Sequence, residues 1–176
     1  MKFNFIDEVP FPREQVWQVN RDRLPALVPY MPTVNAIEVL ERAVEGELVK
    51  LVNRWTGASD DIPGLVKPFV KSEYMTWLDY ATWDQDRWRI DWRLELNILP
   101  GAISASGFTE YQEEGDDTLI HMNGEFRIHP ERIPGLPAML AGRVVPALER
   151  FVVGAVEPNL RKTNECVARY LEEEGF

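Results

Sequence analysis

Three polar side chains on expected strands could take part in proton transfer, and they are Tyr74, Tyr80 and Asn53. The alternation of the chain around them places each on a plausible inward phase of its strand. A phenol or an amide in that position could orient a bound molecule or exchange a proton with it. Tyrosines on a sheet are also common core residues whose hydroxyl bonds to a neighbour. The residues therefore leave two interpretations open, a weakly catalytic site and a packed core.

Other kinds of chemistry find little support in the sequence. It lacks a phosphate-cradling glycine loop, a metal-ligand cluster and a nucleophile elbow. His121 falls on the polar phase of its strand and His129 precedes Pro130 at a strand end, so surface positions are expected for both. Cys166 lies in a helical apolar pattern, which is typical of a buried, inert thiol. We therefore expect no metal and no cofactor.

The composition is that of one folded domain, expected to span residues 1–176. Hydrophobic residues make up 45% of the chain, which is enough to bury a core. The net charge of −10 argues against nucleic-acid binding, because attraction to phosphates needs positive charge. One cysteine excludes an internal disulfide. Neither a signal peptide nor a membrane-spanning segment is recognisable, so a cytoplasmic location is the default expectation.

Alternation with a period of two predicts an antiparallel meander after one N-terminal strand. The first strand is expected at 2–9, and helical spacing predicts two short helices at 11–19 and 24–31. Apolar residues in 88–96 alternate with charged ones, which makes this the clearest half-buried strand. The further strands are expected at 37–42, 48–55, 72–80, 88–96, 103–112 and 120–128.

The C-terminal stretch 136–175 reads as one long amphipathic helix, because its apolar residues recur at steps of three and four. Pro137 suits the first helical turn, and Gly175 suits the end. Pro146 and Pro158 lie inside the pattern, where we expect kinks, or a break at Pro146. A helix of this length needs a broad apolar partner, which the meander can supply.

The segment 57–71 interrupts the meander with a polar turn followed by an apolar run. A plain surface loop would not need so many large apolar residues together. The segment is therefore expected to be a flap or short helix that closes over something apolar, or else a segment packed on the core.

The order of these elements resembles the START-like superfamily, also called SRPBCC, birch-pollen-allergen-like or helix-grip. The resemblance rests on 5–9, 12–17, the strand 88–96 and the helix 137–174. It implies an α+β fold in which an antiparallel sheet of about seven strands wraps around the C-terminal helix. Two short helices follow the first strand in this fold.

The resemblance also implies that an apolar or amphipathic small molecule, with a lipid as the first expectation, binds between sheet and helix. A solid core is the alternative, since interiors pack without voids. START-like proteins include polyketide cyclases and aromatases, so an enzyme is a second alternative. The third is a protein-interaction module that exposes the apolar end of a frayed C-terminal helix, or Trp77 and Trp83. The residues expected to line the ligand site are Trp55, Leu65, Lys67, Phe69, Lys71, Tyr80, Trp92, Met122, Phe126, Val152 and Val156.

The runs 34–42, 48–55 and 62–69 also resemble the PRELI-type phospholipid-transfer proteins. In that family a lid follows the corresponding strand and the cavity takes a phospholipid. This second resemblance implies that Lys67 and Lys71 meet a phosphate head group, and that the protein contacts membranes transiently.

Overall fold

The computed structural model describes residues 1–57, 76–97 and 101–175, with the side chains of 151–159 outside the description. Over these residues, seven strands form one antiparallel sheet in the order β1-β7-β6-β5-β4-β3-β2. The strands are β1 (Lys2–Val9), β2 (Val34–Glu45), β3 (Leu48–Gly57), β4 (Thr76–Asp84), β5 (Arg89–Leu96), β6 (Ile103–Glu114) and β7 (Asp117–Ile128).

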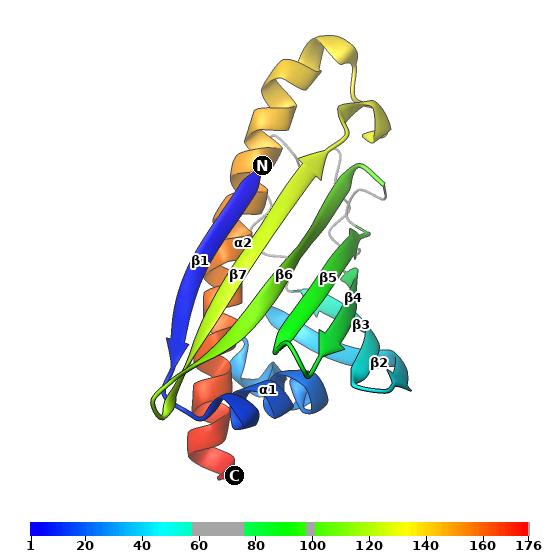
Figure 1. Ribbon diagram of the computed structural model, residues 1–176. Helices are drawn as coiled ribbons and strands as arrows, with labels where there is room; N and C mark the ends of the chain where they lie inside the picture. The colour runs from blue at the N-terminus through cyan, green and yellow to red at the C-terminus, as the bar shows by residue number, and fades with distance from the viewer. Residues whose placement is uncertain (58–75, 98–100, 176) are drawn as a thin grey trace.

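The helices come in the expected order. Helix α1 (Arg13–Asp22) follows β1, the 3₁₀ helix η1 (Leu24–Tyr30) follows α1, and a 3₁₀ turn η4 (Pro130–Arg132) follows β7. Helix α2 (Ala138–Glu174) then runs along one face of the curved sheet, while α1 lies at its lower end (Figure 1). The predicted α+β fold, with a sheet wrapped around a C-terminal helix, is confirmed.

Helix α2 begins after Pro137 and ends at Gly175, whose φ of 65° suits a residue without a side chain. The backbone is helical through both Pro146 and Pro158. The predicted break at Pro146 is therefore wrong. Each proline removes only one hydrogen bond, whereas packing of the helix as a whole supplies most of its stability.

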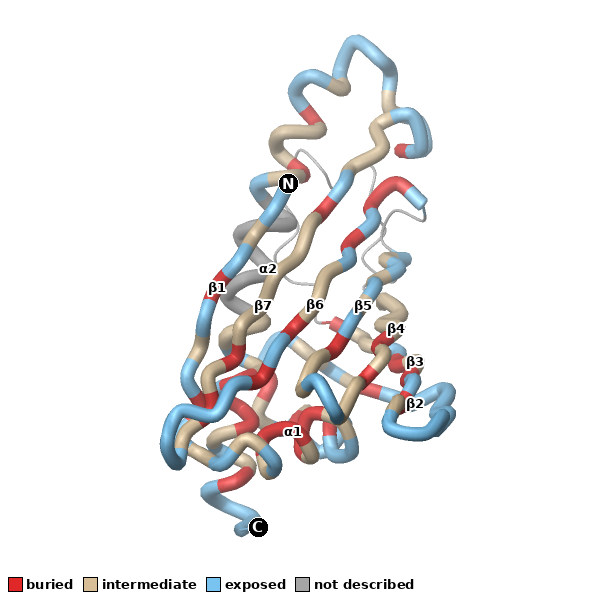
Figure 2. The backbone as a smooth tube through the Cα atoms, viewed as in Figure 1, coloured by how far each residue is buried: buried red, intermediate tan, exposed pale blue. Residues whose placement is uncertain are grey.

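The inner face of the sheet is the face that bears Trp83, Ile90 and Ile120 and packs against the helices. At the lower end the core is solid and centred on Trp17 of α1, which is fully buried. Its ring meets Trp83, Trp88 and Tyr111 edge-on, with centroids 4.8, 5.3 and 5.2 Å away. Buried residues gather around α1 in Figure 2. The strands are thus anchored firmly at one end.

Helix α2 is tied to the first strand by a polar contact. Asp7 of β1 faces inward and forms an ion pair with Arg161, and Asn164 donates a hydrogen bond of 2.9 Å to the same carboxylate. The guanidinium of Arg161 also lies 4.5 Å from the centre of the Phe5 ring. These contacts fix where α2 crosses the sheet and thereby set the space between them.

Candidate functional site

The strand register shows which side chains share the inner face, because residues directly opposite each other point to the same side. The inward side chains of β3, β4 and β5 fall into two groups by burial. The closed half, Val49, Leu51, Ala81, Trp83 and Ile90, is buried. The open half, Trp55, Trp77, Asp79, Trp92, Leu94 and Leu96, faces the same way but is partly exposed.

The floor of the open half is aromatic. Trp92 of β5 lies across Gly107 of β6 and Gly124 of β7, and its ring stacks with Phe3 at a centroid distance of 6.2 Å. A Cβ atom on Gly107 would come within 2.6 Å of the Trp92 ring, and one on Gly124 within 2.5 Å of Phe3. The two glycines therefore make room for a flat aromatic surface. The Trp92 indole donates to Thr109 at 3.2 Å, which fixes the ring.

A polar cluster stands beside this floor and consists of Asp79, Asn53 and Trp55. Asp79 of β4 lies opposite Asn53 of β3, whose buried amide donates to the carboxylate at 3.4 Å. Burial raises the pKa of Asp79 to about 6, although the amide and the nearby indole of Trp55 favour the charged form. Trp55 in turn stacks on Trp77, with centroids 5.6 Å apart and planes at 14°.

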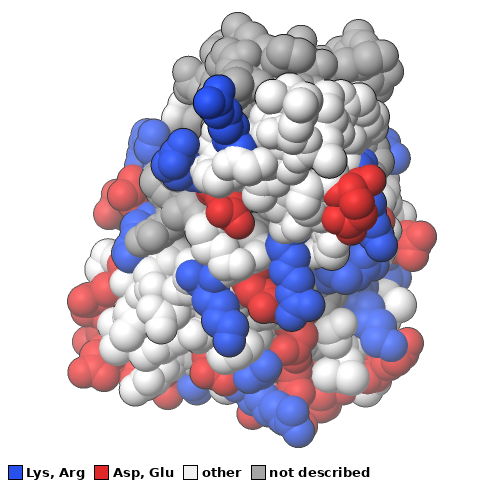
Figure 3. Space-filling view, turned by 90° about the horizontal axis from the view of Figure 1, so that it is seen from above, with Lys and Arg blue, Asp and Glu red and all other residues white. Residues whose placement is uncertain are grey.

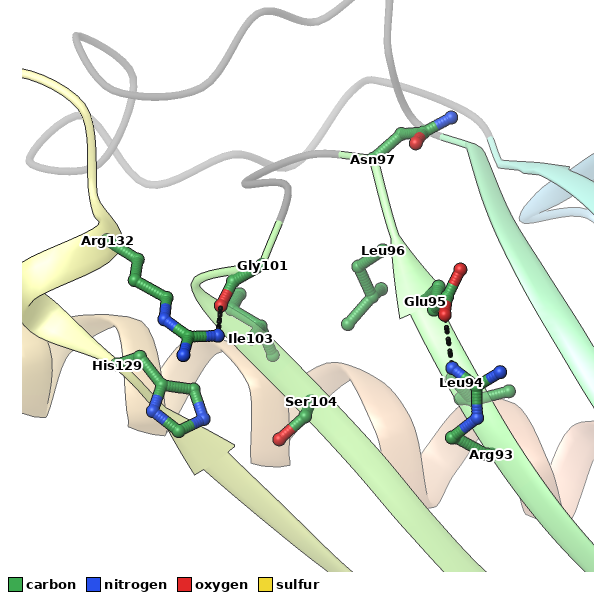
Figure 4. Close-up of a pocket in the computed structure, with 10 residues that line it drawn as sticks. All are labelled: Arg93, Leu94, Glu95, Leu96, Asn97, Gly101, Ile103, Ser104, His129 and Arg132. Carbon is green, nitrogen blue, oxygen red and sulfur yellow. Dashed lines mark hydrogen bonds and ion pairs between the residues drawn. The ribbon is translucent and has the colours of Figure 1, made fainter.

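At the upper end of the sheet, β5 and β6 separate and leave a cavity of about 400 Å³ (Figure 4). Their last paired residues are Glu95 and Ser104. Beyond them Asn97 hydrogen-bonds to Thr76 instead, at 2.9 Å. Leu94, Leu96 and Ile103 form an apolar wall, while Arg132 donates to the Gly101 carbonyl at 3.3 Å. The cavity is lined by Arg93, Leu94, Glu95, Leu96, Asn97, Gly101, Ile103, Ser104, His129 and Arg132.

The structure brings several of the predicted residues together. Asn53, Trp55, Trp92, Met122 and Phe126 all project from the inner face. Other predicted positions lie outside the description: Leu65, Lys67, Phe69, Lys71 and Tyr74 belong to residues 58–75, and the side chains of Val152 and Val156 belong to the undescribed part of α2.

Tyr80 is on the wrong face for the role predicted for it. It pairs with Arg93 on the outer face of the sheet, and its hydroxyl donates to Glu95 at 3.1 Å. The Arg93 guanidinium covers its ring at 4.1 Å from the centroid. The inward prediction for Tyr80 is therefore wrong, because the phase of β4 is the opposite of the one assumed.

Because the inward and outward positions of β4 are exchanged relative to the prediction, Asp79 was not predicted to face inward, and two tryptophans were predicted on the wrong face. Trp83 is buried against Trp17, and Trp77 stacks on Trp55 at the inner face. Neither forms the exposed patch expected for an interaction module. One signal could have revealed this: when the alternation is extended to Ala81 and Trp83, the phase that holds Asp79 is the more apolar one.

The remaining candidate reactive groups are the cysteine, the possible metal ligands and His129. Cys166 is buried, its thiol lies 3.1 Å from the Tyr30 carbonyl, and burial raises its pKa, which fits an inert thiol. Within the described ranges, no group of three or more His, Cys, Asp and Glu side chains is arranged to hold a metal ion. His129 is half-buried at the cavity wall rather than free at the surface, 3.5 Å from Glu131.

Acidic and basic side chains are interspersed over the end of the molecule viewed in Figure 3. No helix in the described part of the chain is long and apolar enough to cross a membrane.

No protein-family model matches the chain, and no curated protein matches it. Solved structures do match over nearly its whole length. The Zhui aromatase/cyclase from Streptomyces sp. R1128 has a TM-score of 0.68 at 18% identity, covering 99% of this chain and 98% of its own. A protein from Thermus thermophilus has a TM-score of 0.64 at 20% identity, covering 96% of this chain and 98% of its own.

Norcoclaurine synthase from Thalictrum flavum aligns over 98% of this chain and 87% of its own, with a TM-score of 0.56 at 12% identity. These likenesses extend over nearly the whole chain and show that it shares the overall fold of these proteins. The chain therefore has the START-like, or SRPBCC, helix-grip fold.

Proposed function

We propose that the protein binds an apolar or amphipathic small molecule, with a lipid as the first candidate, between the open half of the sheet and α2. The observation that carries this proposal is the contrast between the two halves of one inner face. On β3, β4 and β5, large side chains are buried in the closed half, whereas equally large ones in the open half keep partial contact with solvent. Trp92, Leu94 and Leu96 of the open half pack with their other sides against a second cluster that includes Phe126. Apolar concave surfaces with a few polar groups are the usual sites for small ligands.

The cavity between β5 and β6 supports the proposal as a route to this surface. Leu94 and Leu96 line the cavity and also belong to the open half. A ligand could therefore place its apolar part against Trp92 and a polar part at the rim, where Arg132 and His129 lie. The aromatase/cyclase among the similar structures adds support, because its name implies that a fold of this kind works on a small molecule.

Two matched leucine variants test the binding site. Leu94 points to the inner face, and Leu78 of the neighbouring strand points to the outer face. We expect Leu94→Gln to weaken the binding of a fluorescent fatty acid about ten-fold, because an amide would then face the ligand. Leu78→Gln should leave binding unchanged. A fluorescence titration measures both.

Native mass spectrometry of the purified protein, followed by organic extraction, would identify any ligand that travels with it. A stoichiometric fatty acid or phospholipid would support the proposal. If a phospholipid is found, Lys67→Glu and Lys71→Glu test the head-group contact inferred from sequence. An empty protein that also fails to bind the fluorescent fatty acid would contradict the lipid proposal.

An aromatase/cyclase-like enzyme is the second candidate, and Asp79 favours it. A carboxyl whose pKa is about 6 can both accept and release a proton near neutral pH. If the protein catalyses proton transfer, Asp79→Asn should abolish turnover of a bound substrate while the substrate still binds. Unchanged turnover in this variant would exclude Asp79 as the catalytic group.

A further inference from the structure

The surroundings of Asp79 are unusual for a carboxylate. Its neighbours on the inner face are Asn53 and Trp55 on β3 and Leu94 on β5, none of which is charged. The inner faces of β3, β4 and β5, which the structure describes throughout, carry no lysine, arginine or histidine beside it. Asp79 keeps some contact with solvent, but its carboxylate is largely withdrawn from water, and such groups are normally paired with a cation or a metal.

Among the described residues, hydrogen bonding is weak as well as uncharged. The Asn53 amide donates to the carboxylate over a long 3.4 Å, and its own carbonyl oxygen is buried without a partner in the described structure. The Trp55 indole lies close enough to favour the charged carboxyl but completes no hydrogen bond within normal limits. The unpartnered Asn53 Oδ1 thus stands beside an Asp79 carboxylate that accepts one long hydrogen bond, and both groups can accept from a further donor.

The aromatic pair next to Asp79 narrows the kind of donor. Trp77 is two residues from Asp79 on β4, and Trp55 is two residues from Asn53 on β3, so the stacked rings adjoin the carboxylate. Tryptophan faces attract cations, and a carboxylate repels anionic groups. A protonated amine supplies both several N–H donors and a positive charge.

We propose that Asp79, with Asn53, Trp55 and Trp77, binds the ammonium group of an amine-bearing apolar ligand. This inference rests on the proposed function, because the apolar part of such a ligand would occupy the open half. It adds the ligand class: an amine attached to an aromatic or aliphatic body. An alcohol of the same shape offers a single hydrogen bond and no charge, so it binds less tightly.

A pair of probes that differ only in the polar group tests the inference. We would titrate wild-type protein by calorimetry with naphthylethylamine and with naphthylethanol, at pH about 8 and at pH about 5. These values lie on either side of the Asp79 pKa of about 6. At the higher pH the amine should bind at least about ten-fold more tightly than the alcohol. At the lower pH, where Asp79 takes up a proton, this preference should shrink.

Asp79→Asn keeps the shape of the side chain and removes its charge, so the preference for the amine should vanish while the alcohol binds as before. Asp91→Asn is the matched control, because Asp91 is an exposed carboxylate on the outer face of β5. It should keep the preference.

Equal binding of the two probes by wild type, or a preference that survives Asp79→Asn, would overturn the amine inference and leave the pocket standing. Failure of both probes to bind wild type would overturn the proposed pocket, and the amine inference with it. The wild-type comparison needs no variant, so it holds even if Asp79→Asn folds poorly.

Discussion

At the scale of single residues, the burial of Asp79 should be visible in the pH dependence of the free energy of unfolding. Burial raises its pKa from the ordinary 3.8 to about 6, so folded protein keeps this proton where unfolded chain has released it. The contribution of Asp79 to stability is therefore full below pH about 4 and is lost as the pH rises to about 6. We expect Asp79→Asn to gain up to about 3 kcal/mol relative to wild type across this window and to keep the gain above it.

Urea unfolding of the two proteins at a series of pH values measures this gain as a difference, in which the other carboxylates cancel. Tyr80→Phe is a suitable control, because Tyr80 lies on the outer face and the substitution leaves Asp79 untouched. A difference between Asp79→Asn and wild type that stays flat from pH about 4 to pH about 7 would show that the Asp79 pKa is not raised.

Residue types in β4 show why the site was only partly predictable. Alternation correctly separates the side chains of 76–84 into two sets, but both sets contain aromatic and polar residues. Which set points inward depends on pairing with β3 and β5. Asp79 lies directly opposite Asn53, which points inward, so Asp79 points inward too. In β5, where charged and apolar residues separate cleanly, the sequence placed Trp92 correctly.

At the scale of elements, the contact between β1 and α2 should contribute measurably to the free energy of unfolding. Asp7 is mostly buried and holds both Arg161 and the buried amide of Asn164. We expect Asp7→Ala to lower the free energy of unfolding by about 1–3 kcal/mol, because it leaves a buried amide without its acceptor. Glu45→Ala, which breaks the exposed pair with Lys50, should change it by less than about 1 kcal/mol.

Chemical denaturation of both variants makes the comparison, and equal losses would mean that the contact to Asp7 is no stronger than a surface pair.

The helices and strands themselves could be predicted from the sequence. The two short helices, the strand order along the chain and the ends of α2 follow from periodicity and end signals. The continuity of α2 through Pro146 was not predicted, because tertiary packing overrides a local penalty.

At the scale of the whole molecule, the fold combines a solid end with an end that keeps apolar surface in contact with solvent. Sequence could not decide between a hollow and a solid interior. Both halves carry tryptophan and leucine or isoleucine side chains, and among the described residues it is α1, η1 and the end of α2 that fill the space against the closed half. The PRELI-type resemblance stays a prediction, since the run 62–69 that supports it falls outside the described residues.

This division predicts uneven local stability. Backbone amides of the closed half, near Leu51 and Ala81, pack against the cluster around Trp17 and should exchange with solvent only on global unfolding. Amides near Trp55 and Leu96 should exchange faster in the free protein and slow down when a ligand fills the open half, because the ligand then buries the same side chains. Hydrogen exchange followed by mass spectrometry measures both rates. Equal protection in the two halves would mean that the sheet opens as one unit, and ligand-induced protection in the closed half would place the binding site elsewhere.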